Sequence, residues 1–284
     1  PYGAAVILAV SGATGSVGGA VIARARAAGH RVRALTRREQ PARDGVTWIA
    51  GDLANPGDLC AGADAVIHIA GVVNAPDLAG FAAGNIAGTE AIVAAAQAAG
   101  VRRFVHVSSL AAREPELSNY GWSKADAERI VTGSDRDWTI VRPPAVYGPG
   151  DLEMLELFRL AGRGIALTPP PGRLSVIHVD DLARLLLVCA ERDPGRIILD
   201  PEDASGGFSH ADFARMIGDA VGNRVRPIAL PAALLKTAAR ADRLVRGDRA
   251  KLTPDRAAYM SHPDWTADPA KAPPADLWTP AIAT

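Results

Sequence analysis

The sequence predicts an α/β protein with a doubly wound parallel sheet. Two observations support this class: short apolar runs rich in valine and isoleucine recur along the first half of the chain, and helical stretches lie between several of them. Parallel strands covered by helices on both faces appear in a sequence as such continuous apolar runs. We therefore expect buried strands at residues 5–10, 32–35, 46–50, 65–70, 104–107 and 139–141.

Helices are expected between these strands, at residues 17–28, 85–99 and 123–131. Gly29 and Gly100 each follow an alanine-rich helix and precede a strand. A residue that tolerates positive φ can end a helix at such a place. Both glycines are therefore expected to have a structural role.

The second half of the chain has a different pattern. Turn-rich segments (YGPGD and TPPPGRLS) follow Val146, and residues 180–191 then form a helix that returns to the sheet. Ser209 is expected to cap a helix that ends at residue 221, and Pro231 to open another that ends near residue 245. We expect a sheet domain of residues 1–148 with 176–200 returning to it, and a small, mostly helical lobe of residues 149–175 and 201–284.

Composition excludes several classes of protein. The 284 residues are 48% hydrophobic, enough to bury a substantial interior. Since 31 basic residues balance 31 acidic ones, no overall field favours nucleic acid or an anionic membrane. Cys60 and Cys189 are too few for a disulfide framework, which favours a reducing compartment, and we expect the cytoplasm. The apolar residues 4–10 are far fewer than the ~20 that span a bilayer.

A glycine motif follows the first expected strand and opens the first helix, with the spacing GxxGxxG instead of the commoner GxGxxG. Backbone amides there can face a phosphate, and the helix N-terminus supplies partial positive charge. The motif predicts that the sheet domain is a Rossmann-type dinucleotide-binding domain; a tight structural turn is the alternative. The residues expected to contact the cofactor are Gly12, Thr14, Gly15, Ser16, Val17 and Gly18.

The tip of the second strand indicates which dinucleotide is bound. An acidic residue there would accept from the ribose 2′-hydroxyl, but the sequence has Arg37 and Arg38. An arginine can pair with a 2′-phosphate, so these residues favour NADP over NAD. Two solvated surface arginines are the alternative.

A serine, a tyrosine and a lysine form a candidate catalytic set. Ser109 follows a strand, and Tyr120 lies four residues before Lys124, on the same face of a helix. A neighbouring ammonium is expected to lower the tyrosine pKa toward neutrality, and Ser109 can hydrogen-bond the substrate oxygen. The set predicts hydride transfer to or from a nicotinamide, with Tyr120 exchanging the proton.

At these residues the chain resembles the extended short-chain dehydrogenase/reductase family, the epimerase/dehydratase-like branch, over nearly its whole length. Further matching segments are GDL, VIHIAG, NIAGT, RPPAVYGPGD and IHVDDLA. The resemblance implies that Tyr120 and Lys124 also contact the cofactor and that Asn85 organises cofactor or solvent, a helix N-cap being its alternative role. It also implies cofactor contacts along the chain at Asp52, Leu53, Ala70, Gly71, Pro143, Ala145 and Val146.

Three departures from the family pattern bear on the substrate. Ser11 replaces a threonine before the first glycine. Ser109 and Tyr120 are only eleven residues apart, and the RPPAVYGP segment has prolines where many sugar epimerases have another sequence. A bulky nucleotide-sugar pocket is therefore less favoured than chemistry on a smaller carbonyl or alcohol.

Three functions remain open from sequence. The first is an NADP(H)-dependent oxidoreductase acting on a small carbonyl or alcohol. The second is a nucleotide-sugar epimerase or dehydratase with tightly held NAD, and the third is a non-catalytic dinucleotide sensor or assembly subunit. A homodimer formed through the helices after Asn85 and around Tyr120 is expected by analogy, with no nucleic-acid or membrane partner.

Other conspicuous residues have structural interpretations. The six histidines lack ligand-like spacing, so no metal site is expected. His68 and His106 lie in apolar strands and are expected in the core, and by resemblance His178 stabilises the junction between sheet and lobe. Trp265 and Trp278 could line a substrate cleft or anchor the tail.

Overall fold

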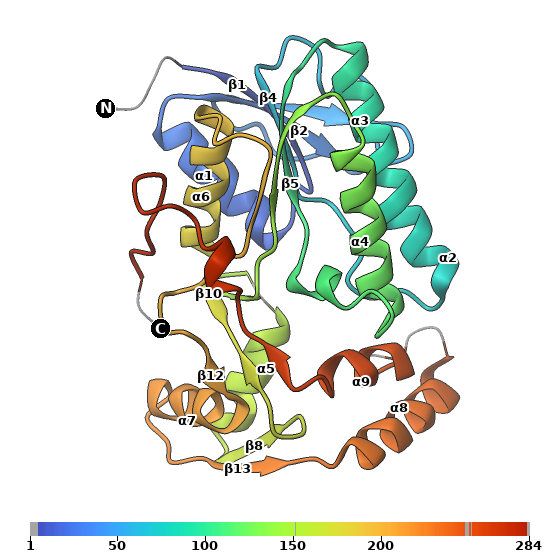
Figure 1. Cartoon of the computed structure of the whole chain (residues 1–284), viewed down its shortest axis with the longest axis vertical. Helices are drawn as coiled ribbons and strands as arrows, with labels where there is room; N and C mark the ends of the chain where they lie inside the picture. The colour runs from blue at the N-terminus through green and yellow to red at the C-terminus, as the bar shows by residue number, and fades with distance from the viewer. Residues whose placement is uncertain (1–4, 151, 248–249, 251, 283–284) are drawn as a thin grey trace.

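The computed structural model describes residues 5–150, 152–247, 250 and 252–282. Its centre is a seven-stranded sheet in the order β11-β6-β5-β4-β1-β2-β3, and every pair of neighbouring strands is parallel (Figure 1). Six of these strands were predicted, with boundaries within two residues, and β11 was not. The strands are β1 (Ile7–Ser11), β2 (Arg31–Thr36), β3 (Val46–Ala50), β4 (Ala65–His68), β5 (Arg103–Val107), β6 (Asp137–Val141) and β11 (Ile197–Leu199).

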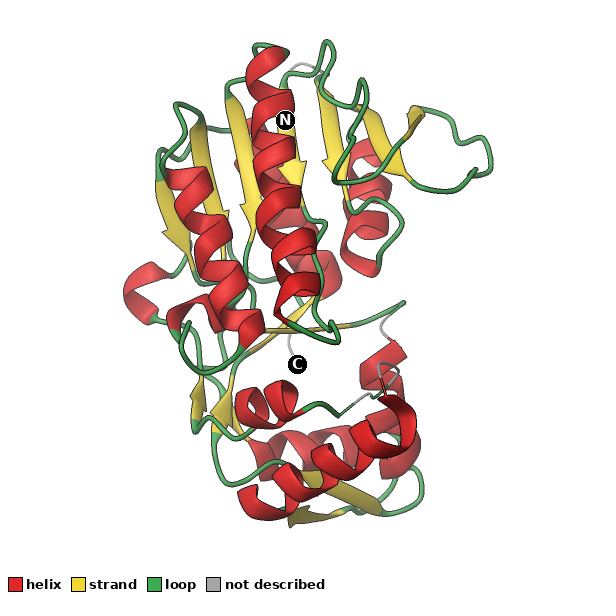
Figure 2. Ribbon diagram, turned by 90° about the vertical axis from the view of Figure 1, so that its right-hand side faces the viewer, coloured by secondary structure: helices red, strands yellow, loops and turns green. Residues whose placement is uncertain are grey.

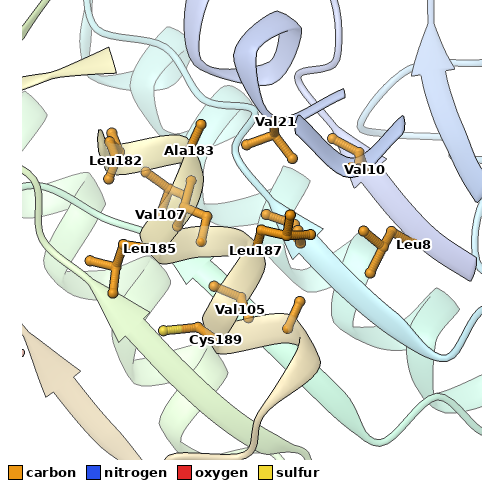
Figure 3. Close-up of a cluster of buried hydrophobic side chains, with 14 of the residues drawn as sticks. Leu8, Val10, Val21, Val105, Val107, Leu182, Ala183, Leu185, Leu187 and Cys189 are labelled. Carbon is orange, nitrogen blue, oxygen red and sulfur yellow. The ribbon is translucent and has the colours of Figure 1, made fainter. Parts of the chain in front are cut away.

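Helices cover both faces of this sheet. The pair α1 (Ser16–Ala27) and α6 (Val179–Glu191) lies on one face, and α3 (Gly88–Ala98) and α4 (Asn119–Thr132) lie on the other (Figure 1). Figure 3 shows the first of these interfaces, where apolar side chains of β1 and β5 meet those of α6. Burial on both faces explains why the strands are continuous apolar runs, as the predicted α/β class requires.

The helix before β5 begins earlier than expected. Its first turn is α2 (Leu78–Phe81), capped by Asp77, whose carboxylate accepts from the Gly80 amide at 2.8 Å. A π-helical segment, η1 (Ala82–Ala87), then leads directly into α3. The 21 residues Leu78–Ala98 are long and apolar enough to cross a membrane by length and composition. One face of this stretch packs against the sheet, with Ile92 fully buried, and 33% of its apolar window is buried.

The lobe lies beyond the end of the sheet toward which the strands point (Figure 2). Its regular structure is mostly helical, and it also contains short strands that pair residues far apart in sequence and were not predicted. The predicted cap is confirmed: the Ser209 hydroxyl accepts from the Asp212 amide at 3.0 Å. The helices are α5 (Leu152–Ala161), α7 (His210–Ala220), α8 (Ala232–Arg246) and α9 (Pro254–Met260). The short strands outside the central sheet are β7 (Ala145–Tyr147), β8 (Ile165–Thr168), β9 (Arg173–Leu174), β10 (Val176–His178), β12 (Phe208–Ser209), β13 (Arg226–Ala229) and β14 (Asp264–Trp265).

The end of the chain, which the predicted division assigns to the lobe, packs against the sheet domain. Trp278 is buried in the core with α6, and the Arg184 guanidinium lies 5.3 Å from the centre of its ring. Asp181 accepts from the amides of Ala281 and Ile282, at 3.0 and 2.8 Å. Trp278 therefore anchors the tail, which decides between its two predicted roles.

The two predicted helix-ending glycines have the expected backbone. Gly29 has a φ of +84° and Gly100 a φ of +71°, each one residue after the C-cap of an alanine-rich helix. Side chains rarely adopt this conformation, so glycine ends both helices at low cost.

Candidate active site

The glycine loop is tightly packed between β1, β4 and α1. Gly12 has a φ of +72°, and a Cβ at this position would lie 2.7 Å from the Ala70 amide nitrogen. A Cβ on Gly18 would lie 2.1 Å from the Gly12 carbonyl oxygen. Neither position accepts a side chain, so these glycines bring the start of α1 against the strand ends.

The start of α1 offers free backbone donors. Its N-cap, Gly15, provides no side-chain hydrogen bond, and no acidic residue lies in the first turn. By contrast, Ser118 caps α4 by accepting from the Gly121 amide at 3.0 Å. The amides at the start of α1 therefore remain available to an anion, and this arrangement fits a dinucleotide diphosphate. Within the loop, Thr14 is exposed and Ser16 donates to the Pro149 carbonyl at 3.1 Å.

The two arginines lie at the carboxyl edge of the sheet, directly after β2. The Thr36 hydroxyl donates to the Arg38 carbonyl at 2.6 Å and accepts from its amide at 3.2 Å, which forms a turn there. Arg37 and Arg38 are exposed, and within the described part of the chain neither guanidinium has a hydrogen bond or ion pair. Both side chains are therefore available to an exposed phosphate.

Other predicted cofactor residues line the same edge. Asp52 holds the turn after β3 by accepting from the Asn55 amide at 2.8 Å, and Leu53 packs against Gly88. Ala70 donates its amide to the Ser11 hydroxyl at 3.3 Å. Serine and threonine both carry a hydroxyl, so Ser11 can make this hydrogen bond in place of the threonine found in the family pattern.

Asn85 is buried within the π-helical segment, so its predicted alternative as a helix N-cap is wrong. Its side chain accepts from the Val72 amide at 2.6 Å and donates to the Val72 carbonyl at 3.0 Å and the Ser123 hydroxyl at 2.8 Å. A Cβ on Gly71 would lie 2.8 Å from Asn85 Oδ1. Asn85 therefore joins the loop after β4 to α4, and irregular helices of this kind are frequent at functional sites.

Ser109, Tyr120 and Lys124 line one cavity of about 390 Å³, the main cavity. Close packing brings the first two together: a Cβ on Gly121 would lie 2.7 Å from the Ala111 carbonyl oxygen, so α4 approaches the turn after β5 closely. The Ser109 hydroxyl lies close enough to the Tyr120 phenol to affect its pKa, and it accepts from the Ala111 amide at 3.2 Å. The structure thus gathers the predicted catalytic set in one place.

The electrostatics of this set differ from expectation. Burial raises the pKa of Tyr120 above its ordinary value, and the nearby Ser109 hydroxyl lowers it by less. Burial lowers the pKa of Lys124 to about 8, against a smaller opposing effect of Glu128. The Lys124 ammonium donates to the Val107 carbonyl at 2.8 Å. The phenol is therefore a protonated acid at neutral pH, and the predicted lowering of its pKa by Lys124 is wrong for this state of the site.

A buried ion pair joins α4 to the segment after β6. Arg142 donates to both oxygens of Glu128, at 2.8 and 2.6 Å, and the Ser108 hydroxyl donates to the same carboxylate at 2.5 Å. Glu128 lies one turn after Lys124 on α4. The pair therefore fixes the helix that carries the candidate acid.

The remaining walls of the main cavity come from both parts of the chain. The predicted residues Val17, Pro143, Ala145 and Val146 line it. The lobe adds Asp255, Arg256 and Tyr259 of α9, which were not predicted as site residues. A capping signal was present, since Thr253 and Pro254 open α9 with a cap and an N-terminal proline, but nothing in that signal indicates what α9 faces.

The other conspicuous polar residues are structural. Burial lowers the pKa of His68 to about 3, and His68 bonds the hydroxyls of Ser11 and Thr89, at 2.6 and 3.0 Å. His106 is fully buried beside it, and His178 caps α6 by accepting from the Asp180 amide at 3.2 Å. Within the described ranges, no group of three or more potential metal ligands occurs.

Known proteins resemble this chain throughout its length. Residues 12–191 match the family model described as NAD(P)H-binding. The chain is 38% identical to the ceramide reductase of Caulobacter vibrioides, over 95% of this chain and 88% of that protein. It is 32% identical to a 4-hydroxy-2-methyl-3-oxo-4-farnesyl-3,4-dihydroquinoline-1-oxide ketoreductase of Stigmatella aurantiaca, over 66% and 65%. The solved structure of MoeE5 in complex with UDP-glucuronic acid and NAD has a TM-score of 0.69 at 26% identity, over 79% of this chain and 85% of that one.

Proposed function

The chain belongs to the NAD(P)H-binding family and is an NAD(P)-dependent oxidoreductase of the extended short-chain dehydrogenase/reductase type, and on this premise we propose that it is an NADP(H)-dependent ketoreductase. Its substrate is a carbonyl compound smaller than a nucleotide sugar, or the corresponding alcohol. The observation that carries the proposal is the meeting of Ser109, Tyr120 and Lys124 in one cavity beside the glycine loop. The free arginines at the tip of β2 support the choice of NADP.

The residues of the chain divide the chemistry as follows. The cofactor, when bound, supplies or accepts the hydride. Ser109 hydrogen-bonds the carbonyl oxygen of the substrate, and Tyr120, held protonated by burial, donates its proton to that oxygen as negative charge develops. Lys124 would hold the ribose of the bound cofactor with its ammonium group.

Replacement of one atom tests this assignment. Tyr120→Phe removes the acid and keeps the ring, so kcat for NADPH-dependent reduction of a ketone is expected to fall by at least about 100-fold. Tyr147→Phe makes the same change outside the cavities described here and is the matched control. Turnover by Tyr120→Phe equal to that of the control would refute the tyrosine mechanism.

An epimerase or dehydratase of nucleotide sugars is the second candidate, supported by the likeness to MoeE5. Such enzymes keep their NAD between turnovers, whereas a ketoreductase must release its oxidised cofactor. NAD that copurifies with the protein and survives gel filtration, together with calorimetric binding of a UDP-sugar, would favour this candidate. Rapid exchange of NADPH and no UDP-sugar binding would favour the ketoreductase.

Location and assembly are also proposals. We propose a cytoplasmic enzyme, because NADPH-dependent reduction and two buried free thiols, Cys60 and Cys189, suit a reducing compartment.

We propose a homodimer through α3 and α4, by analogy with related enzymes. Light scattering after gel filtration tests the second point: a mass near 29.5 kDa would refute it, and twice that mass would support it.

A further inference from the structure

A second cavity of about 240 Å³ lies within the lobe, between α5, β8 and α7. Leu157 and Leu160 of α5 line one side, and Phe213 and Ile217 of α7 line another. These four residues all lie on helices of the lobe. This cavity is therefore formed almost entirely by the part of the chain whose purpose the glycine motif does not explain.

The lining of this cavity is apolar. No charged side chain occurs among the described residues that form it, and the aromatic residues present their rings. The polar atoms of two of them are bonded to backbone: His210 Nδ1 lies 2.8 Å from the Pro170 carbonyl oxygen, and the Trp265 indole donates to the Tyr259 carbonyl at 2.9 Å. Water finds few partners in such a space, whereas hydrocarbon fits it.

The second cavity adjoins the main cavity. Ala145 and Tyr259 line both. Ala145 is exposed, and its small side chain lines the space where the two cavities meet. The Tyr259 ring lies edge-on to Tyr120, with ring centres 6.1 Å apart, and stacks on Trp265 at 4.7 Å. A continuous apolar wall thus leads from the candidate acid into the lobe.

We propose that the second cavity, here called the tail chamber, binds an unbranched alkyl chain attached to the substrate ketone. The proposal rests on the proposed function, because it requires the carbonyl to stand at Tyr120 while the chain passes Ala145. An apolar cavity of about 150 Å³ holds benzene, so 240 Å³ accommodates roughly eight to ten carbon atoms. The substrate class is therefore ketones with one long aliphatic arm.

A series of 2-alkanones from 2-butanone to 2-dodecanone measures the chamber. With NADPH saturating and each ketone below its solubility limit, kcat/KM is expected to rise about fourfold per methylene and to level off once the chamber is full. Ala166 lines the chamber, whereas its neighbour Ile165 does not and is 47% exposed. Ala166→Phe is expected to lower kcat/KM for 2-dodecanone by tenfold or more, with Ala166→Leu as a milder filling variant, while the matched control Ile165→Phe keeps the full rise.

Two readouts separate failure of this proposal from failure of the proposed function. If the ketones are reduced without dependence on chain length, or if Ala166→Phe and Ile165→Phe keep the same dependence, the chamber does not bind the chain although the ketoreductase stands. If no ketone is reduced, calorimetric binding of 2-decanone to Tyr120→Phe protein with NADPH decides. The affinity of Tyr120→Phe protein is compared with that of the double variant Tyr120→Phe/Ala166→Phe, provided that both have the same melting temperature. Binding of 2-decanone at least tenfold weaker in the double variant supports the chamber. Equal affinity overturns the proposal.

Discussion

The arginines after β2 provide the sharpest test of cofactor choice. The parallel register pairs Val10 of β1 with Ala34 of β2, so the two strands end at the same edge of the sheet, with Gly12 after β1 and Arg37 after β2. Arg37 therefore follows Thr36 next to the loop that would hold the diphosphate. Arg37→Ala removes a positive charge from the place where a ribose 2′-phosphate is expected.

The structure sets the size of the expected effect. A hydrogen bond to a charged group contributes about 1.5–3 kcal/mol, but Arg37 is exposed and solvent screens the contact. We therefore expect about 1–2 kcal/mol, which weakens NADP binding roughly 5- to 30-fold. NAD lacks the 2′-phosphate, so its affinity should change less than about twofold. Added salt should reduce the difference, since the Debye length is about 10 Å at 0.1 M.

Calorimetric titration with NADP and with NAD at low and moderate salt checks these values. Arg43→Ala is the matched control: Arg43 bridges to Val46, and Val46 pairs with Val32 at the start of β2, so Arg43 lies at the opposite edge of the sheet. It removes the same charge without approaching the site. Equal affinities of the unaltered protein for both dinucleotides, or an equal loss for both in Arg37→Ala, would refute the assignment.

Three further predictions follow from the same geometry. Gly12→Ala combines positive φ with a Cβ 2.7 Å from the Ala70 amide, so unfolding by urea should show a loss of at least about 1–3 kcal/mol and NADP binding should weaken; Gly19→Ala, which meets no atom within 4 Å, should not destabilise. With the Lys124 pKa near 8, kcat/KM should fall as pH rises through that value, and Lys124→Arg should lack this limb; a flat profile to pH 9.5 would contradict the assignment. Since the His68 pKa is about 3 when folded and near 6.5 when unfolded, only the unfolded chain binds this proton between those values. The melting temperature should therefore drop as pH falls from 6.5 toward 4, less so for His68→Asn.

The sheet domain was predictable from sequence because its signals are local. Burial on both faces makes each strand a continuous apolar run. Gly12 and Gly18 are needed because the start of α1 lies so close to the strand ends that no side chain fits there, and the glycine spacing shows this in the sequence. Tyr120 and Lys124 share a helix face by spacing alone, so their convergence was also accessible. The tail chamber was not accessible, because Leu157 and Phe213 are far apart in sequence and belong to short elements whose pairing depends on the whole lobe.

The electrostatics of the site could not be predicted for a related reason. The sequence shows that a lysine follows the tyrosine by one helical turn, but it does not show how much water each group loses. Burial of the phenol outweighs the effect of the nearby Ser109 hydroxyl, so the pKa of Tyr120 rises. A phenol that stays protonated can donate its proton in ketone reduction. Its protonation state is thus a property of packing, not of the motif.

The lobe takes part in positioning the candidate acid as well as in covering it. The amide of Asn119, the first residue of α4, donates to the Asp255 carboxylate of α9. This contact satisfies a helix-end donor and places negative charge at a helix N-terminus, both of which stabilise α4. Tyr259 lies one turn after Asp255 on α9 and contacts the Tyr120 ring. One short helix thus both supports α4 and contributes to the wall shared by the two cavities, so a substitution in α9 that changes the tail chamber should also be checked for an effect on kcat.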